Sequence, residues 1–377
     1  MKVALVNPRW SFEGSMSAEC KEPHLPLEYG YARALLGAAG HEAQIFDAHL
    51  CRMTLGELRA ELEAFAPDMS VITTAPSYPF WRTAPPELRV PMETLRALRP
   101  IGGTWVAVGP HGSTTPRATL TKLDLDAVVV GECEDVLTTL AGTSRDAWGT
   151  VPSLAYREGD EVRVQGPAAL TSVDSLLPLE WDARTIALHR HHHDRFDGMP
   201  CGPGAELEAS RGTSNDCGDR LRTRPLEVVL DELDGLIGGG VHYVYFIDEH
   251  FVPDRALLEA LAARDIIFGV QTRIDAWTPA KLDLLGRAGC VSMGAGVESE
   301  LTFAELTELL VRAKRSIPFV QANLLGTADD EADVLAWRAH LRHHGIWSTE
   351  PLPRFPFPAM GAPPNTEQAS VRRVRGA

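Results

Sequence analysis

Short apolar runs alternate with amphipathic stretches along the first 150 residues. The runs cover residues 3–7, 43–47, 68–74, 105–109 and 127–131. Runs of this length, rich in Val, Ile and Ala, are typical of strands buried on both faces. The stretches between them, such as 27–39 and 55–65, carry apolar residues at helical spacing. The pattern predicts an α/β domain over residues 1–150, a parallel Rossmann or flavodoxin-like sheet with helices on both faces.

A second series of strand–helix units begins at Ala205. The expected strands cover 205–210, 242–249, 266–275, 290–299, 319–324 and a last one from 346 to about 351. A helix is expected to begin at Pro225 and to end before Gly238, since Pro suits a first turn and Gly suits a helix end. Six successive units predict a partial, (β/α)6 TIM-like barrel over residues 205–355.

Residues 151–204 lack periodicity and are expected to link the two domains, with a small hairpin at 151–157 and 162–164. This linker also holds a histidine-rich segment, 189–194. Imidazoles at this density can bind a transition metal. Adjacent residues cannot all point at one ion, however, so we interpret the segment as a polar connection. Residues 356–377, rich in Pro, Thr, Ser and Arg, are expected to be a disordered tail.

Composition and charge argue against several classes of partner and location. The 377 residues carry a formal net charge of −15, which argues against nucleic acid or an anionic membrane as the main partner. No apolar run is long enough to predict a transmembrane helix, and no signal peptide is expected. The six cysteines show no disulfide framework, so a cytoplasmic location is expected.

Polar and small residues collect at the expected carboxyl ends of the first-domain strands, where sheets of this kind bind ligands. Glycines and small hydroxyl residues there allow backbone amides to approach an anionic, bulky ligand. The alternative is that they are only turn residues. The candidates are Thr73, Thr74, Ser77, Gly109, His111, Gly112, Ser113 and Glu132.

The barrel strands also end in polar residues, at the edge where a barrel builds its active site. A charged residue inside a barrel is costly unless it is paired or bound to a ligand. Two interpretations stay open: a structural ion network of Arg273 with Asp248, Asp275 or Glu298, or a cradle for a charged ligand. The strand-end residues are Asp248, Glu249, His250, Gln271, Arg273, Asp275, Glu298, Ser299, Gln321 and Asn323.

Four segments of the first half, in order, resemble the cobalamin-binding domain of cobalamin-dependent radical S-adenosylmethionine (SAM) proteins: "GYARALLGAAGHEAQIFDAH", "PDMSVITTAPSY", "VAVGPHGSTTP" and "DAVVVGECEDVL". The resemblance implies that the eight candidates above line a cobalamin site. Asp47-Ala48-His49 resembles the start of the Asp-x-His-x-x-Gly motif, whose histidine ligates cobalt in methionine-synthase-like domains. That motif follows the first strand, whereas His49 follows the second, and position 52 is Arg rather than Gly. We therefore expect no protein imidazole on the cobalt.

The second half resembles the radical SAM barrel of the same family, through "YVYFIDEHF", "VQTRIDAW" and "GCVSMGAGVES". The resemblance implies that Asp248 and Glu249 lie near the methionyl part of SAM, with Arg273 and Glu298 near its carboxylate or ribose. The family's cluster loop carries three cysteines, C-x3-C-x2-C, after an Arg-Gly pair. Here Arg211-Gly212 is followed at those positions by Thr213, Cys217 and Arg220.

One thiolate cannot replace the three that hold a 4Fe–4S cluster. The first hypothesis is therefore a cobalamin-binding protein that acts on a small molecule in specialised metabolism, with SAM as a possible second cofactor and without the usual radical initiation. The second is a catalytically silent partner of an intact paralogue. The third is a radical SAM enzyme with an unusual set of cluster ligands around Cys217. Glu249, Arg273 and Cys217 are the candidate catalytic residues.

Overall fold

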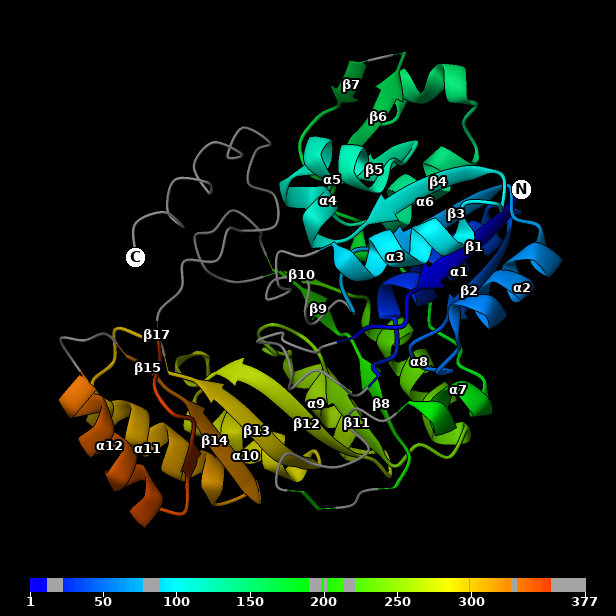
Figure 1. Ribbon diagram of the computed structural model, residues 1–377. Coiled ribbons are helices and arrows are strands. Elements are labelled where there is room, and N and C mark those ends of the chain that lie inside the picture. Colours follow the sequence, from blue (N-terminus) through cyan, green and yellow to red (C-terminus); the bar gives the residue numbers. More distant parts are fainter. Residues whose placement is uncertain are drawn as a thin grey trace. The chain divides into compact units, whose positions relative to one another are not determined.

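The computed structural model describes residues 1–11, 23–76, 88–159, 161–189, 198–199, 202–212, 221–297, 299–326 and 331–353. The described residues fold as two compact units, residues 1–179 and residues 180–353. Figure 1 labels their helices and strands. Each unit is described by itself.

The first unit is built on one mostly parallel sheet whose strand order is β2-β1-β3-β4-β5-β6-β7. Strands β1 to β5 are parallel, and β6 and β7 are antiparallel additions at one edge. The order reverses between β1 and β3, which is the switch point of a flavodoxin-like sheet. The strands are β1 Lys2–Asn7, β2 Glu42–Asp47, β3 Met69–Thr73, β4 Thr104–Val108, β5 Ala127–Val129, β6 Leu154–Glu158 and β7 Glu161–Val164.

Helices cover both faces of this sheet, as the sequence pattern predicts. Val3 and Leu5 of β1 pack on one face with α1 and α6, while Ala4 and Val6 pack on the other with α2, α3 and α5. Both sets are buried because successive residues of a strand point to opposite faces. The helices are α1 Leu27–Ala38, α2 Leu55–Phe65, α3 Arg89–Leu98, α4 Pro110–Thr114, α5 Pro116–Leu123, α6 Glu134–Ala141, and the short 3₁₀ helices η3 Arg145–Thr150 and η4 Val173–Ser175.

The hairpin expected in the linker is present, but it belongs to the first sheet. β6 pairs with β5 from Leu154 to Tyr156, and Leu154 and Tyr156 are part of the core below α1 and α6. These apolar side chains complete the edge of the sheet, so the hairpin is part of the first compact unit.

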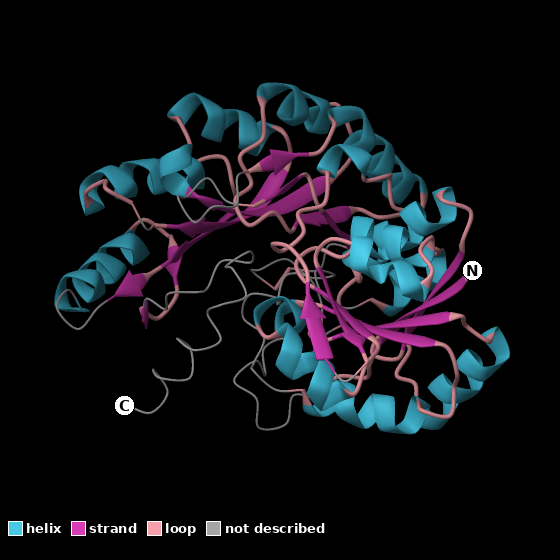
Figure 2. Ribbon diagram, turned by 90° about the horizontal axis from the view of Figure 1, so that it is seen from above, coloured by secondary structure: helices cyan, strands magenta, loops and turns pink. Residues whose placement is uncertain are grey.

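The second unit contains six parallel strands in the order β16-β14-β13-β12-β11-β8. Each successive strand lies beside the preceding one, the arrangement of an open, six-stranded partial barrel. Helices lie along one face of this sheet and leave its other face to the interior of the curve (Figure 2). The strands are β8 Gly204–Leu207, β11 Tyr243–Phe246, β12 Ile267–Arg273, β13 Cys290–Gly296, β14 Phe319–Asn323 and β16 Trp347–Ser348.

The helices of this unit follow the strands as predicted. They are α7 Ala183–Leu188, α8 Leu226–Gly238, α9 Arg255–Ala262, the 3₁₀ helix η5 Ile274–Ala276, α10 Pro279–Arg287, α11 Phe303–Lys314 and α12 Glu331–His343. Two small sheets complete the unit: β9 Ser210–Arg211 with β10 Arg222–Thr223, and β15 Leu325–Gly326 with β17 Leu352–Pro353. In the described parts of both units, no helix is long and apolar enough to cross a membrane.

The first barrel strand differs from its predicted extent. The sequence predicts one strand over 205–210, whereas β8 ends at Leu207 and β9 begins at Ser210. The backbone amides of Ala209 and Ser210 donate to the carboxylate of Asp248 instead of continuing the ladder to β11. A buried side-chain acceptor therefore ends the strand.

Candidate functional site

The loop after β3 is closed by its own threonines. The Thr73 hydroxyl donates to the carbonyl of Ala75 at 2.8 Å, and the Thr74 hydroxyl donates to the carbonyl of Val108 at 2.8 Å. Both side chains are buried. Their hydroxyl protons are used inside the protein, so these residues shape the strand-end edge, and their contribution to a ligand site would come from the backbone.

The turn after β4 requires glycine. Gly109 has a φ of 104°, and a Cβ atom there would lie 2.7 Å from the Thr74 hydroxyl oxygen. A Cβ on Gly112 would lie 2.7 Å from a methyl of Val128. Ser113 donates to the carbonyl of Gly109 at 3.0 Å and accepts from the amide of Gly131 at 2.9 Å. The three residues thus join the ends of β4 and β5 closely, with the half-buried His111 between them.

The end of β5 is locked to a later segment. The carboxylate of Glu132 accepts from the amide of Thr171 at 2.7 Å, and the Thr171 hydroxyl donates to Glu134 at 2.9 Å. Glu132 and Glu134 are both buried. Glu132 therefore also has a structural role, because its hydrogen bond fixes Thr171 near the carboxyl end of β5.

A polar cluster at the ends of β1 and β2 was missed in the sequence. Asn7 donates to Asp47 at 3.0 Å, and the indole N–H of Trp10 donates to the side-chain oxygen of Asn7 at 2.8 Å. Burial raises the pKa of Asp47 to about 6, against the bonds from Leu50 and Asn7 that lower it. The cluster fixes the loop that follows β1 beside the switch point. His49 lies in the turn after β2, which fits its interpretation as a loop residue.

In the second unit, β9 and β10 form the stem of the predicted cluster loop. Arg211 pairs with Arg222 and Ser210 with Thr223, so the two ends of the loop are brought together. Inside the stem, the Arg211 guanidinium bonds the Glu208 carboxylate at 2.9 Å, and both side chains are buried. Five of the predicted site residues lie outside the described residues: Ser77, Thr213, Cys217, Arg220 and Glu298.

Asp248 holds the base of this stem. Its carboxylate accepts from the amide of Ala209 at 2.8 Å, and from the amide and hydroxyl of Ser210 at 2.8 and 3.1 Å. The side chain is 2% exposed. Burial raises its pKa to about 7, although the bonds from Ala209 and Ser210 lower it. Asp248 therefore positions the cluster-loop stem through its backbone.

Two further buried contacts fix the same region, and the sequence did not predict either of them. Arg224 donates to Glu232 of α8 and to the carbonyl of Glu208, at 2.8 and 2.7 Å. His189, the first histidine of the histidine-rich segment, lies 2.8 Å from Glu206 of β8, and neither side chain is exposed. The sequence feature that could have indicated these contacts is the pair Glu206 and Glu208, two charged residues in a strand expected to be buried. Residues 191–193 lie outside the described residues.

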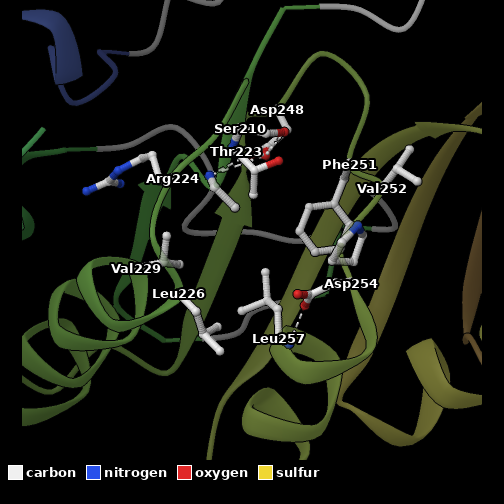
Figure 3. A pocket seen from close by; sticks show the side chains of 12 residues that line it. Ser210, Thr223, Arg224, Leu226, Val229, Asp248, Phe251, Val252, Asp254 and Leu257 are labelled. Atoms are coloured by element: carbon white, nitrogen blue, oxygen red, sulfur yellow. Dashed lines mark hydrogen bonds between the residues drawn. The ribbon is translucent and has the colours of Figure 1, made fainter. Parts of the chain in front are cut away.

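A small pocket of about 80 Å³ lies beside the stem, between the beginnings of α8 and α9. Figure 3 shows Asp248, Ser210 and Thr223 at one end of it and the apolar side chains at the other. The apolar lining comes from Leu226, Val229, Phe251, Val252, Pro253 and Leu257.

Arg273, at the end of β12, forms a bidentate pair with Asp275 at 3.0 and 2.6 Å. Burial acts to raise the pKa of Asp275, but the bonds from Arg273 and Ser299 outweigh it and the pKa lies below its ordinary value. Among the partners considered for Arg273, the structure thus brings Asp275 to it. Glu249 is exposed, and Gln321 donates to Asn323 at 2.9 Å. In the described ranges, no group of three or more His, Cys, Asp or Glu side chains could hold a metal ion.

Comparison with family models finds no match, and no curated protein matches the sequence. Solved structures do match. The radical S-adenosylmethionine methyltransferase TsrM from Kitasatospora setae, with cobalamin and a 4Fe–4S cluster bound, superposes with a TM-score of 0.68 at 18% identity, over 92% of this chain and 70% of that chain. The chain has the fold of this enzyme.

A second TsrM structure, with tryptophan substrate and a SAM analogue bound, matches equally, over 92% of this chain and 71% of that chain. The cobalamin-dependent S-adenosylmethionine radical enzyme OxsB, with aqua-cobalamin and SAM bound, superposes with a TM-score of 0.68 at 16% identity, over 89% of this chain. This chain spans about half the length of OxsB, 51%. The predicted fold class, a flavodoxin-like unit followed by a partial barrel, is confirmed.

Proposed function

We propose that this protein binds cobalamin at the carboxyl ends of the first sheet and acts on a small molecule held by the partial barrel. The observation that carries the proposal is the fold match to TsrM and OxsB across both units. Structures of both proteins contain cobalamin. Cobalamin, when bound, would supply a cobalt atom able to carry and transfer a methyl group.

The first unit offers a surface that suits a bulky ligand. In the loops after β3 and β4, the hydroxyl groups of Thr73, Thr74 and Ser113 bond to backbone carbonyls of the protein, and Gly109 and Gly112 carry no side chain. Backbone can therefore come close to a ligand at this edge. His111 is half-buried in the short helix α4, and we propose that its imidazole contacts the ligand.

The second unit is proposed to bind SAM at its strand ends. Arg273, fixed by Asp275, offers a guanidinium for the carboxylate of the ligand, and the exposed Glu249 offers a partner for its amino group. Asp248 would act through Ala209 and Ser210 rather than by touching SAM. Glu298 completes the proposed set.

The cluster loop argues against ordinary radical initiation. Its three ligand positions read Thr213, Cys217 and Arg220, and a 4Fe–4S cluster rests on a full set of anionic ligands. The residues present do not fit the cluster, so no step is assigned to it. The same loss favours a second candidate, a silent binding partner of an intact paralogue. That candidate predicts cobalamin binding without turnover and co-purification with the paralogue.

The experiment is a titration of anaerobically purified protein with hydroxocobalamin, followed by its visible absorption after gel filtration. The intact chain should retain the corrinoid, and His111→Ala should weaken retention. Thr114→Ala is the matched control, because Thr114 lies exposed in the same helix and its hydroxyl bonds the carbonyl of Pro110. A chain that elutes free of corrinoid at all concentrations would refute the proposal.

A further inference from the structure

Four neighbouring strands of the partial barrel place one residue each on the same level. The register pairs Gln271 of β12 with Gly294 of β13, Gly294 with Gln321 of β14, and Gln321 with Trp347 of β16. Paired residues of neighbouring parallel strands point to the same face of a sheet. These four residues therefore form one row across the sheet.

The row lies on the face opposite to the helices. Val270, Val320 and Ala322 alternate with row residues and are fully buried on the helix side. Gln271, in contrast, is exposed, and Gln321 is half-buried. Trp347 has 64% of its surface exposed, the largest exposed fraction among the large hydrophobic side chains of the described residues. The inner face is thus exposed at Gln271 and at Trp347, the two ends of the row.

The row residue of β13, Gly294, has no side chain. β13 contributes Ser292, Gly294 and Gly296 to the inner face, alternating with Met293 and Ala295. A Cβ built on Gly294 would meet nothing closer than 3.6 Å, the amide nitrogen of Asn323. A side chain at this position would therefore make ordinary packing contacts with Asn323 and Gln271, and Gly294 itself is buried.

Trp347 lies at the edge of the sheet, beside Gln321 of β14. Its ring lies 6.3 Å from that of Phe319, one row below on β14, at a tilt of 41°. The side-chain amide of Gln321 is directed by its bond to Asn323. An exposed indole next to the ordered amide of Gln321 is suited to a flat ring that carries hydrogen-bonding groups at its edge.

We propose that Trp347 is a specificity-determining residue, and that the small-molecule substrate presents an aromatic ring that stacks on its indole beside Gln321. The inference deepens the proposed function, since it names the substrate class of the barrel. Aromatic stacking of this kind changes affinity by about tenfold. It needs no corrinoid for its test.

The test uses the full chain without corrinoid, with L-tryptophan and L-cyclohexylalanine as probes of equal charge and with aromatic and saturated rings. Isothermal titration should show binding of L-tryptophan and at least tenfold weaker binding of L-cyclohexylalanine. Trp347→Ala should weaken L-tryptophan binding about tenfold, and Trp347→Phe should restore most of it. Leu335→Ala, which removes another exposed apolar side chain from α12, should leave binding unchanged.

Equal affinity for the two probes, or equal loss in Trp347→Ala and Leu335→Ala, would overturn the proposal. So would the finding that the chain's own residues 354–377 occupy the site, seen as increased acrylamide quenching of Trp347 fluorescence after their removal. Corrinoid retention is measured on the same preparations. Its loss in the intact chain would refute the proposed function without changing the outcome for Trp347.

Discussion

At the scale of single residues, several side chains placed by sequence at a ligand turn out to organise backbone. Asp248 ends its strand as expected, but its carboxylate is spent on the amides of Ala209 and Ser210. Thr73 and Ser113 likewise donate to carbonyls within their own loops, and Thr74 donates to the carbonyl of Val108 at the end of β4. Sequence patterns locate such residues on the correct edge. They cannot tell whether a short polar side chain faces a ligand or the protein backbone, because either orientation satisfies its hydrogen bonds.

Asp248 makes stability depend on pH. Its pKa is raised from 3.8 to about 7 by burial, so the folded state binds a proton that the unfolded state has released. The free energy of unfolding should therefore fall as pH rises from about 4 to about 7, at up to about 1.4 kcal/mol per pH unit. Urea unfolding of Asp248→Asn across this range should show a shallower fall. Asp265→Asn, at an exposed position, is the control, and an equally steep fall in Asp248→Asn would contradict the assignment.

Gly109 predicts a second effect at this scale. Gly109→Ala should lower the free energy of unfolding by about 1–3 kcal/mol, because alanine is strained at positive φ and its Cβ would meet Thr74. Gly102→Ala, at the other end of β4, meets nothing within 4 Å and should change stability little. The two variants are compared by urea denaturation, and equal stabilities would show that the turn tolerates a side chain.

At the scale of elements, the sequence predicts most of the fold. Apolar periodicity places α2 at its observed bounds, Leu55–Phe65, and gives all six barrel strands within a few residues. It fails where tertiary contacts decide, as at Ala209 and Ser210, whose amides turn to Asp248. It also separates the hairpin β6–β7 from the sheet that it extends, because strand pairing across a long interval leaves no local signal.

The buried ion pair between Arg224 and Glu232 of α8 should contribute strongly to the free energy of unfolding. Arg224→Ala leaves buried Glu232 without its cation and should cost about 3–5 kcal/mol of stability. The matched pair on α9, Arg255 with Glu259, is exposed, so Arg255→Ala should have little effect. Thermal unfolding of both variants checks the difference. A comparable loss from both would mean that burial does not distinguish the two pairs.

At the scale of the whole molecule, the chain matches cobalamin-dependent radical SAM enzymes in fold, while the loop that we propose to correspond to their cluster loop has Thr213, Cys217 and Arg220 at the three ligand positions. Restoring cysteine at two of these positions, in Thr213→Cys with Arg220→Cys, completes the C-x3-C-x2-C spacing with Cys217. Because the stem of the loop is held by Asp248 and Arg211, the double variant should retain about four irons per chain after anaerobic reconstitution. Thr213→Cys with Cys217→Ser is the control and should not. An iron-free double variant would show that more than cysteines has been lost.

The most direct test of cobalamin binding without an iron–sulfur cluster is metal analysis of the unaltered chain. The chain is first reconstituted anaerobically with iron, sulfide and hydroxocobalamin. Elemental analysis after desalting should find cobalt in stoichiometric amount and iron only in traces. A cubane complement of iron in the natural sequence, or protein free of cobalt, would contradict it.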